Sequence, residues 1–141
     1  MMYGRVNLGR IYESYSDDRG ETWTEAIPTN LAAYPCPRNL KRIPKTGDLL
    51  LIWNQLSRWE AMHGLFRHRL TCAISRDEGK TWSNFKDIEP DLSLSYMYPA
   101  LTFDGDTALV LYSEGGYDGG PVTWNNTSLK LARVPYQWFY E

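Results

Sequence analysis

The sequence has no surplus of one charge and no long hydrophobic run. Its 141 residues include 15 lysines and arginines against 17 aspartates and glutamates, which gives a formal net charge of −2. This balance argues against the basic surfaces that bind nucleic acid or an anionic membrane. No apolar stretch approaches the roughly 20 residues that a membrane-spanning helix needs. We therefore expect neither nucleic acid nor a membrane as a partner.

Cysteine and histidine are also scarce. Cys36 and Cys72 lie far apart in the chain, and His63 and His68 have no cysteine or carboxylate at the spacing of metal ligands. We expect both cysteines to be small buried apolar residues rather than halves of a disulfide or zinc ligands. The sequence predicts no metal site and no cofactor. Residues 1–5 do not resemble a signal peptide, which leaves the compartment open.

What the chain does contain is aromatic residues and a repeated phrase. Aromatic side chains make up 14% of the residues and hydrophobic ones 43%, which favours a packed, β-rich core over disorder. The phrase Ser-x-Asp-x-Gly-x-Thr-Trp occurs twice, and such a repeat indicates a modular array. Its fixed positions are Ser16, Asp18, Gly20, Thr22 and Trp23 in the first copy and Ser75, Asp77, Gly79, Thr81 and Trp82 in the second.

Each copy lies between two short runs with strand character, so we expect it at the turn of a β-hairpin. Gly20 and Gly79 can adopt positive φ without steric cost. Asp18 and Asp77 can accept hydrogen bonds from backbone N–H groups within the loop. The tryptophan that ends each copy offers a large apolar face to a core. A calcium loop is the alternative use of the aspartates, but the ligand spacing of an EF-hand is absent.

The coarse pattern predicts strands and almost no helix. We place strands near residues 2–6, 10–16, 22–27, 38–43, 49–55, 69–75, 81–87, 98–103, 107–113, 128–134 and 136–140. Tight turns are expected at residues 47–48 and 104–106, and longer loops at 56–67 and 114–127. The loop at 56–67 mixes arginines with aromatic residues. We favour an interface or packing role for it over stacking on a sugar.

The repeated phrase resembles the Asp-box, or BNR repeat, of sialidase-type β-propellers. Residues 40–54 and 69–82 are similar to strand–turn–strand segments of bacterial sialidase-like proteins, and residues 2–6 and 96–101 match weaker patterns of that family. The resemblance implies an all-β fold of about three four-stranded antiparallel blades from a six-bladed propeller. Residues 1–141 would form a single partial propeller. Its parts would be a blade that lacks one strand (about 1–30), a second blade (about 31–90) and a third (about 91–141).

An array of three blades has two open flanks, whereas exposed apolar sheet faces are normally covered or paired. Either the chain is a part of a longer protein, or copies associate to close the ring. We predict a homo-oligomer, most simply a dimer that closes six blades through a large apolar interface.

The resemblance also implies a site for a sialylated or other acidic glycan. Sialidases use a tyrosine nucleophile. The family adds a glutamate as its base, an aspartate as acid/base and three arginines that hold the substrate carboxylate. Tyr98 matches the nucleophile, with Tyr96 as the alternative. The other matches are Arg5 for the middle arginine, Arg67 or Arg69 for the last one, and Glu114 for a glutamate that steadies an arginine.

The family's first arginine, acid/base aspartate and glutamate base all fall ahead of residue 1. A tyrosine without a base is a poor nucleophile at neutral pH. We therefore expect the chain to be the C-terminal half of a sialidase-like glycoside hydrolase that is inactive in isolation. The alternatives are a non-catalytic carbohydrate-binding or self-associating propeller module, and a truncated product retained as a structural oligomer.

Overall fold

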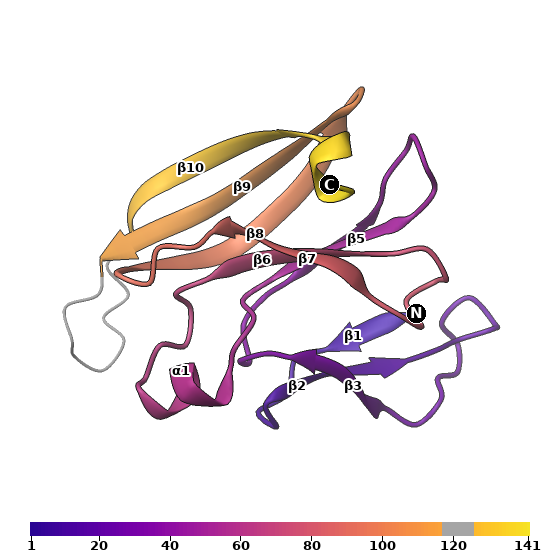
Figure 1. Cartoon of the computed structure of the whole chain (residues 1–141). Coiled ribbons are helices and arrows are strands. Elements are labelled where there is room, and N and C mark those ends of the chain that lie inside the picture. Colours follow the sequence, from indigo (N-terminus) through magenta and orange to yellow (C-terminus); the bar gives the residue numbers. More distant parts are fainter. Residues whose placement is uncertain (117–125) are drawn as a thin grey trace.

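Three antiparallel sheets make up the described part of the protein. The computed structural model describes residues 1–116 and 126–141, without the side chains of residues 126 and 127. Sheet 1 contains β1 (Met2–Gly4), β2 (Arg10–Ser14) and β3 (Ile27–Ala32), in that order. Sheet 2 contains β4 (Asn39–Arg42), β5 (Leu49–Trp53), β6 (Leu70–Ser75) and β7 (Ser83–Glu89), and sheet 3 contains β8 (Leu94–Asp104), β9 (Thr107–Gly116) and β10 (Asn126–Pro135). Figure 1 shows the sheets as stacked layers with sheet 2 in the middle. The prediction of an all-β, antiparallel fold is confirmed.

The middle sheet is buried on both faces. All five residues of β5 are buried, and successive side chains of a strand point to opposite faces. Leu50 and Ile52 therefore pack against sheet 3 in one core, while Leu51 and Trp53 pack against sheet 1 in the other. This explains why residues 49–53 are continuously hydrophobic and do not alternate.

Two predicted strands are wrong. The strand placed at 22–27 is instead β3, because residues 22–26 belong to the connection that follows the first repeat. The strand placed at 136–140 is instead a 3₁₀ helix, η1 (Tyr136–Phe139), so sheet 3 has three strands where the sequence predicted four. The Phe139 ring is fully buried in the core between sheets 2 and 3. Lys86 Nζ on β7 donates to the Trp138 carbonyl at 2.7 Å, which holds η1 against sheet 2.

The expected loop at 56–67 contains a short helix, α1 (Arg58–Met62). Its start is a capping box, in which Ser57 and Glu60 each accept a hydrogen bond from the other's backbone N–H. The expected loop at 114–127 is narrower than predicted, because β9 extends to Gly116 and β10 begins at Asn126. Residues 117–125 lie outside the described part of the chain.

The cysteines behave as expected of small apolar residues, since Cys36 and Cys72 are both buried and free. Within the described ranges, no helix is long and apolar enough to cross a membrane. In the same part of the chain, no three histidines, cysteines or carboxylates are placed so that they could hold a metal ion together.

The two ends of the sheets differ. The repeat turns follow Ser14 in sheet 1 and Ser75 in sheet 2. Strand register pairs Ser14 with Met2, and Ser75 with Leu49. The far end of β1 and the starts of β4 and β6 therefore lie at the opposite end of the sheets, together with α1 (Figure 1).

Candidate functional site

Both repeat turns are closed by the same hydrogen bonds. In the second turn, Asp77 Oδ1 accepts from the Thr81 backbone N–H at 2.8 Å and Asp77 Oδ2 accepts from the Thr81 hydroxyl at 2.6 Å. Ser75 Oγ donates to Asp77 Oδ1 at 2.8 Å and accepts from the Gly79 N–H at 2.8 Å. The first turn repeats these contacts with Ser16, Asp18, Gly20 and Thr22.

The aspartates therefore act as internal acceptors of their turns. Hydrogen bonds from the Thr81 side chain, the Thr81 backbone and Ser75 lower the pKa of Asp77 to about 2. The matching bonds from Thr22 hold the pKa of Asp18 well below its usual range. Because both oxygens of each carboxylate are engaged, the geometry supports the structural interpretation of the repeat over a calcium loop. The glycines have positive φ as predicted, with φ of 97° at Gly20 and 88° at Gly79.

At the opposite end of the sheets, three arginines surround residues 34–38. Arg5 follows β1, and its Nε donates to the Pro35 carbonyl at 2.6 Å. Arg38 precedes β4, and its Nη2 donates to the Cys36 carbonyl at 3.4 Å. Arg67 precedes β6, and the neighbouring Phe66 ring stacks on Tyr34 at 4.4 Å between centroids. We refer to Arg5, Arg38 and Arg67, together with Tyr98, as the arginine face.

The electrostatics of Cys36 show how close these charges lie. Burial raises the pKa of the Cys36 thiol, and the charges of Arg67, Arg38 and Arg5 oppose that rise. Burial lowers the pKa of Arg38, and the positive charge of Arg5 lowers it further. Three like charges in one place favour the binding of an anion.

The accessibility of the arginines differs. Arg5 is exposed, Arg38 is half-buried, and Arg67 is 4% exposed. Arg38 Nη1 is buried and hydrogen-bonds to no residue in the described part of the chain. Arg5 and Arg38 are thus the arginines of this face that a ligand can reach most directly. The sequence analysis missed Arg38; the cue was its position as the first residue of the strand predicted at 38–43, two residues after Cys36.

Tyr98 and Tyr96 have opposite surroundings. Tyr98 is 50% exposed, and it lies at a bulge where the register between β8 and β9 shifts. Its φ of 55° is in the left-handed region, which is rare for a bulky residue and is found at functional sites. Tyr96 is fully buried, and burial raises its pKa to about 12. Tyr98 is therefore the one of the two that can meet a ligand at the surface.

The structure brings Arg69 and Glu114 into ion pairs rather than onto the arginine face. Arg69 Nε donates to Glu60 Oε1 at 2.9 Å, and Arg69 Nη1 lies 3.6 Å from Asp87 Oδ2. Glu114 Oε2 accepts from Lys130 Nζ at 2.8 Å, so its described partner is a lysine where the family pattern implied an arginine.

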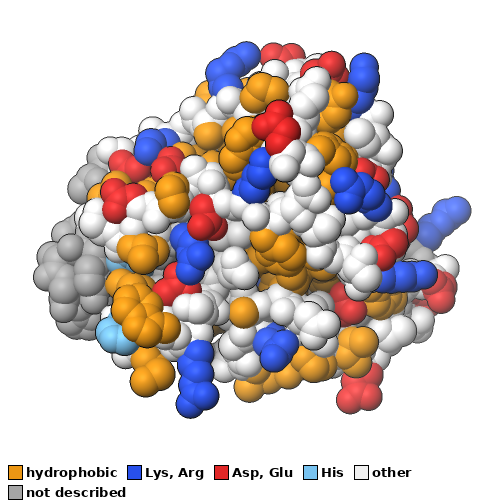
Figure 2. Space-filling view, in the orientation of Figure 1, with side chains coloured by type: hydrophobic (Ala, Val, Ile, Leu, Met, Phe, Trp, Pro, Cys, Tyr) orange, Lys and Arg blue, Asp and Glu red, His pale blue; other side chains and the backbone are white. Residues whose placement is uncertain are grey.

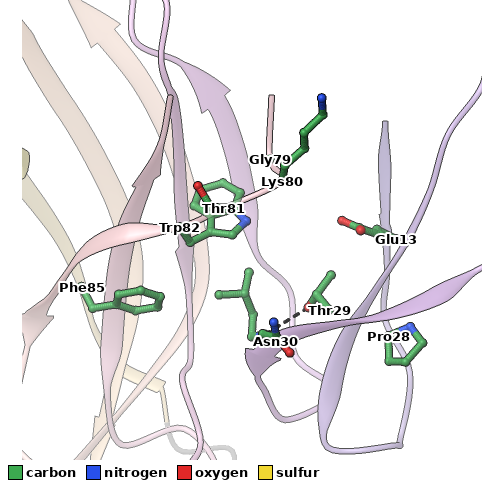
Figure 3. A pocket seen from close by; sticks show the side chains of 10 residues that line it. Glu13, Pro28, Thr29, Asn30, Gly79, Lys80, Thr81, Trp82 and Phe85 are labelled. Atoms are coloured by element: carbon green, nitrogen blue, oxygen red, sulfur yellow. Dashed lines mark hydrogen bonds between the residues drawn. The ribbon is translucent and has the colours of Figure 1, made fainter. Parts of the chain in front are cut away.

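Apart from the arginine face, the structure has a cleft between sheet 1 and the second repeat turn (Figure 3). Its volume is about 350 Å³. Figure 3 shows the Trp82 and Phe85 rings on one side and Glu13, Thr29 and Asn30 on the other. Aromatic rings facing a carboxylate and an amide are a polar and apolar combination suited to a small ligand.

The chain was compared with known proteins. A family model described as "BNR repeat-like domain" matches residues 1–111. A search of curated proteins found no match. Among solved structures, the chain is similar to the intramolecular trans-sialidase from Ruminococcus gnavus in complex with oseltamivir carboxylate, with a TM-score of 0.66 and 21% identity. The similarity covers 97% of this chain and 30% of that one, so the chain spans under a third of that protein's length.

Proposed function

The chain belongs to the BNR repeat-like domain family and has a sialidase-like fold, and on that basis we propose that its arginine face binds the carboxylate of a sialylated or other acidic glycan. The observation that carries the proposal is the convergence of Arg5, Arg38 and Arg67 on residues 34–38. These arginines come from segments far apart in the sequence, so the fold creates this concentration of positive charge.

The chemistry of the face suits a carboxylate. A guanidinium is planar, always charged, and can donate two parallel hydrogen bonds to the two oxygens of a carboxylate. Arg5, which is exposed, and Arg38, which is half-buried, would make these contacts. Arg67 is buried and makes a cation–π contact with the Tyr98 ring.

We expect binding without turnover from the isolated chain. A tyrosine becomes a nucleophile at neutral pH when a neighbouring base accepts its proton. Among residues 1–116 and 126–141, no carboxylate hydrogen-bonds to Tyr98. The Tyr98 ring instead contacts a cation, the guanidinium of Arg67. Tyr98 would then contribute the face of its ring as a stacking surface in the binding site.

The same proposal includes the architecture. Sheets 1, 2 and 3 would be three adjacent blades of one propeller, and residues 1–32, 39–89 and 94–135 would carry them. The face-to-face packing of successive sheets supports this, as does the recurrence of one turn in sheets 1 and 2. The arginine face would lie on the end of the ring opposite the repeat turns.

The binding test uses calorimetric titration of the protein with N-acetylneuraminic acid and with its 2,3-dehydro analogue. Arg38→Ala is expected to weaken binding at least tenfold, which corresponds to the loss of about 1.4 kcal/mol. Arg58→Ala is the matched control, because Arg58 is an exposed arginine on α1 outside the face. Equal affinity of the two variants would refute the carboxylate site. Release of 4-methylumbelliferone from its sialoside by the pure protein would refute the absence of turnover.

A neutral-sugar site is the second candidate, and the cleft in Figure 3 favours it. A pyranose ring could stack on Phe85, which is 47% exposed, while Glu13 and Asn30 accept and donate hydrogen bonds to its hydroxyls. Phe85→Ala is expected to abolish binding of neutral sugars and to leave N-acetylneuraminic acid binding unchanged. Arg38→Ala is expected to weaken N-acetylneuraminic acid binding and to leave neutral-sugar binding unchanged. This contrast between the two variants would separate the two sites.

A further inference from the structure

The two repeat turns are equivalent in hydrogen bonding but not in what covers them. The second turn is covered by sheet 1. A Cβ added to Gly79 would lie 2.8 Å from Met1 Sδ and 3.3 Å from the Tyr3 hydroxyl. The Tyr3 and Trp82 rings lie 6.3 Å apart, and both belong to the core between sheets 1 and 2. The first strand of sheet 1 thus acts as the cover of the turn in sheet 2.

The first turn has no comparable cover within the described residues. Trp23 is 43% exposed, and the only atoms near an added Cβ on Gly20 belong to Trp23 itself, at 3.6 Å and beyond. Met2 is 49% exposed and points away from sheet 2, because its neighbour Tyr3 points toward it. We call Met2 and Trp23 the sheet 1 flank.

The outer face of sheet 3 is apolar and exposed in the same way. Strand register places Leu111 of β9 between Ala100 of β8 and Leu131 of β10. Leu111, Leu129 and Leu131 are 39%, 68% and 55% exposed. We call Ala100, Leu111, Leu129 and Leu131 the sheet 3 flank. Figure 2 shows hydrophobic side chains at the surface over both the uppermost and the lowermost parts of the molecule.

The packing within the chain shows what fits such a face. On sheet 2, the corresponding face carries Leu50, Ile52 and Ile74, and it is completely buried by sheet 3. On sheet 1, the corresponding face carries Ile11 and Tyr3, and it is covered by sheet 2. The face of sheet 1 that points toward sheet 2 is covered by sheet 2, and the face of sheet 2 that points toward sheet 3 is covered by sheet 3. The equivalent face of sheet 3 is the sheet 3 flank, which is exposed.

Strand order identifies the cover of the first turn. β1 covers the second turn, and β1 is the strand next to β2, which leads into the first repeat. In sheet 3, β9 pairs with β10 as β1 pairs with β2, although β1 is an edge strand and β9 is the middle strand of its sheet. Leu111 is the exposed leucine on the outward face of β9. A second copy would bring this strand over Trp23 as β1 lies over Trp82.

Charge is complementary between the flanks. Arg133 is exposed beside the sheet 3 flank, opposite Leu109 in the register. Three exposed carboxylates, those of Asp17, Glu21 and Glu25, surround the first turn and outnumber its one exposed cation, Arg19. Opposite charges around apolar patches favour one orientation of contact over the others.

We propose that two copies of the chain associate head to tail, with the sheet 3 flank of each copy packed on the sheet 1 flank of the other. Two such contacts close a ring related by a twofold axis, because each copy supplies three sheets to a ring of six. The inference rests on the blade arrangement proposed above. It does not depend on glycan binding, since the flanks lie outside the arginine face.

The test is the mass of the 141-residue protein in solution, measured by light scattering coupled to size-exclusion chromatography at micromolar concentration. The expected result is a dimer. Leu131→Glu alters the sheet 3 flank, and Trp23→Glu and Met2→Glu alter the sheet 1 flank. Each is expected to give a folded monomer, with dimer affinity reduced at least about 100-fold, as at a buried contact of a protein interface. Met62→Glu is the control, because Met62 is 74% exposed on α1 outside both flanks, and it should remain dimeric.

A mixture of the variants distinguishes head-to-tail contact from other arrangements. Leu131→Glu mixed with Met2→Glu retains one unaltered pair of flanks, so the mixture should recover a dimer that neither variant forms alone. Far-UV circular dichroism verifies that each variant is folded. A folded wild-type monomer, a dimer that survives both kinds of variant, or an open series of larger species would each overturn the two-copy ring. If the wild-type protein is monomeric but still binds N-acetylneuraminic acid, the dimer fails and the glycan proposal stands.

Discussion

The guanidinium carbon of Arg67 lies 5.6 Å from the centroid of the Tyr98 ring. Arg67 is 4% exposed and Tyr98 is 50% exposed, so a buried cation supports an accessible aromatic ring. The backbone at Tyr98 has a φ of 55°, which directs the ring out of the regular strand at a bulge. The pair therefore presents an aromatic surface beside a site of high positive charge.

The first prediction separates the ring of Tyr98 from its hydroxyl. Tyr98→Phe retains the cation–π contact and is expected to change the affinity for N-acetylneuraminic acid by less than about twofold. Tyr98→Leu removes the aromatic face, and we expect it to weaken binding about fivefold, equivalent to roughly 1 kcal/mol. Calorimetric titration measures both affinities. If Tyr98→Phe were the more damaging change, the hydroxyl would be the group that contacts the ligand.

The second prediction concerns pH. The pKa of Asp77 in the folded protein is about 2, below the value of about 3.9 in an unfolded chain. Its contribution to stability is therefore fully present above about pH 4 and is lost as the pH falls through about 2. Asp77→Asn should lower the urea midpoint at pH 6 and flatten the decline of stability in this acidic window.

Asp17→Asn is the control for that experiment. Asp17 occupies a variable position of the first repeat turn and is exposed. Its substitution should leave the urea midpoint at pH 6 and the acid profile near those of the wild-type protein. Identical acid profiles for Asp77→Asn and the wild-type protein would contradict the assigned role of Asp77.

The third prediction tests the contact between the second repeat turn and the first strand. Gly79→Ala combines a φ of 88° with a Cβ only 2.8 Å from Met1 Sδ. Gly47→Ala has a similar φ of 80° but meets nothing within 4 Å. We expect Gly47→Ala to lower the free energy of unfolding by roughly 1 kcal/mol and Gly79→Ala to lower it by about 1 kcal/mol more, because Met1 and Tyr3 must shift. Equal losses in chemical denaturation would show that Met1 does not hold its position over the turn.

The fourth prediction concerns Glu60, which is 2% exposed. Its carboxylate accepts from the Ser57 N–H at 2.6 Å and pairs with Arg69, so one group holds both the start of α1 and the start of β6. Glu60→Gln is expected to lower the free energy of unfolding by about 1–3 kcal/mol, because a buried hydrogen-bond network loses its charge. Thermal denaturation measures the loss, and Glu25→Gln at an exposed position should be neutral.

Glu60 also contributes to the acid dependence of stability. Although burial raises the pKa of Glu60, hydrogen bonds from Ser57 and Arg69 bring it below its ordinary value. A carboxyl group with a lowered pKa stabilises the protein above its unfolded pKa, near 4.3, and loses that effect as the pH falls. Glu60→Gln should therefore reduce the wild-type protein's loss of stability below about pH 4. A steeper loss would mean that burial, and not hydrogen bonding, dominates at this site.

Much of the fold could be predicted where local chemistry and strand periodicity agree. The hairpin at the second repeat, the turn glycines and most of the strand placed at 49–55 were predictable because each depends on neighbours in sequence. Helix α1 could also have been recognised, since Ser57 and Glu60 have the spacing of a capping box. Residues 136–140 were misassigned because a short run of aromatic side chains is equally compatible with a strand and with a helical turn. The core that receives Phe139 decides between the two.

The candidate site was less accessible to sequence reasoning. Arg5 and Arg67 were identified, whereas Arg38 joins them only when β4 lies between sheets 1 and 3. Arg69 looks equivalent to Arg67 in the sequence. In the structure, however, the Arg69 guanidinium is ion-paired with Glu60. The position of Glu60 depends on α1, a helix that the sequence analysis did not predict.

The sequence by itself determined the unit from which this protein is built, because a Ser-x-Asp-x-Gly-x-Thr-Trp turn satisfies its own hydrogen bonds with residues at most four positions apart. The tertiary structure decided what each unit meets. Trp82 is covered by Tyr3 and the chemically equivalent Trp23 is exposed, because burial depends on which sheet packs alongside and not on the residues of the turn. The same holds for the arginines, whose combined charge exists only where three distant segments converge.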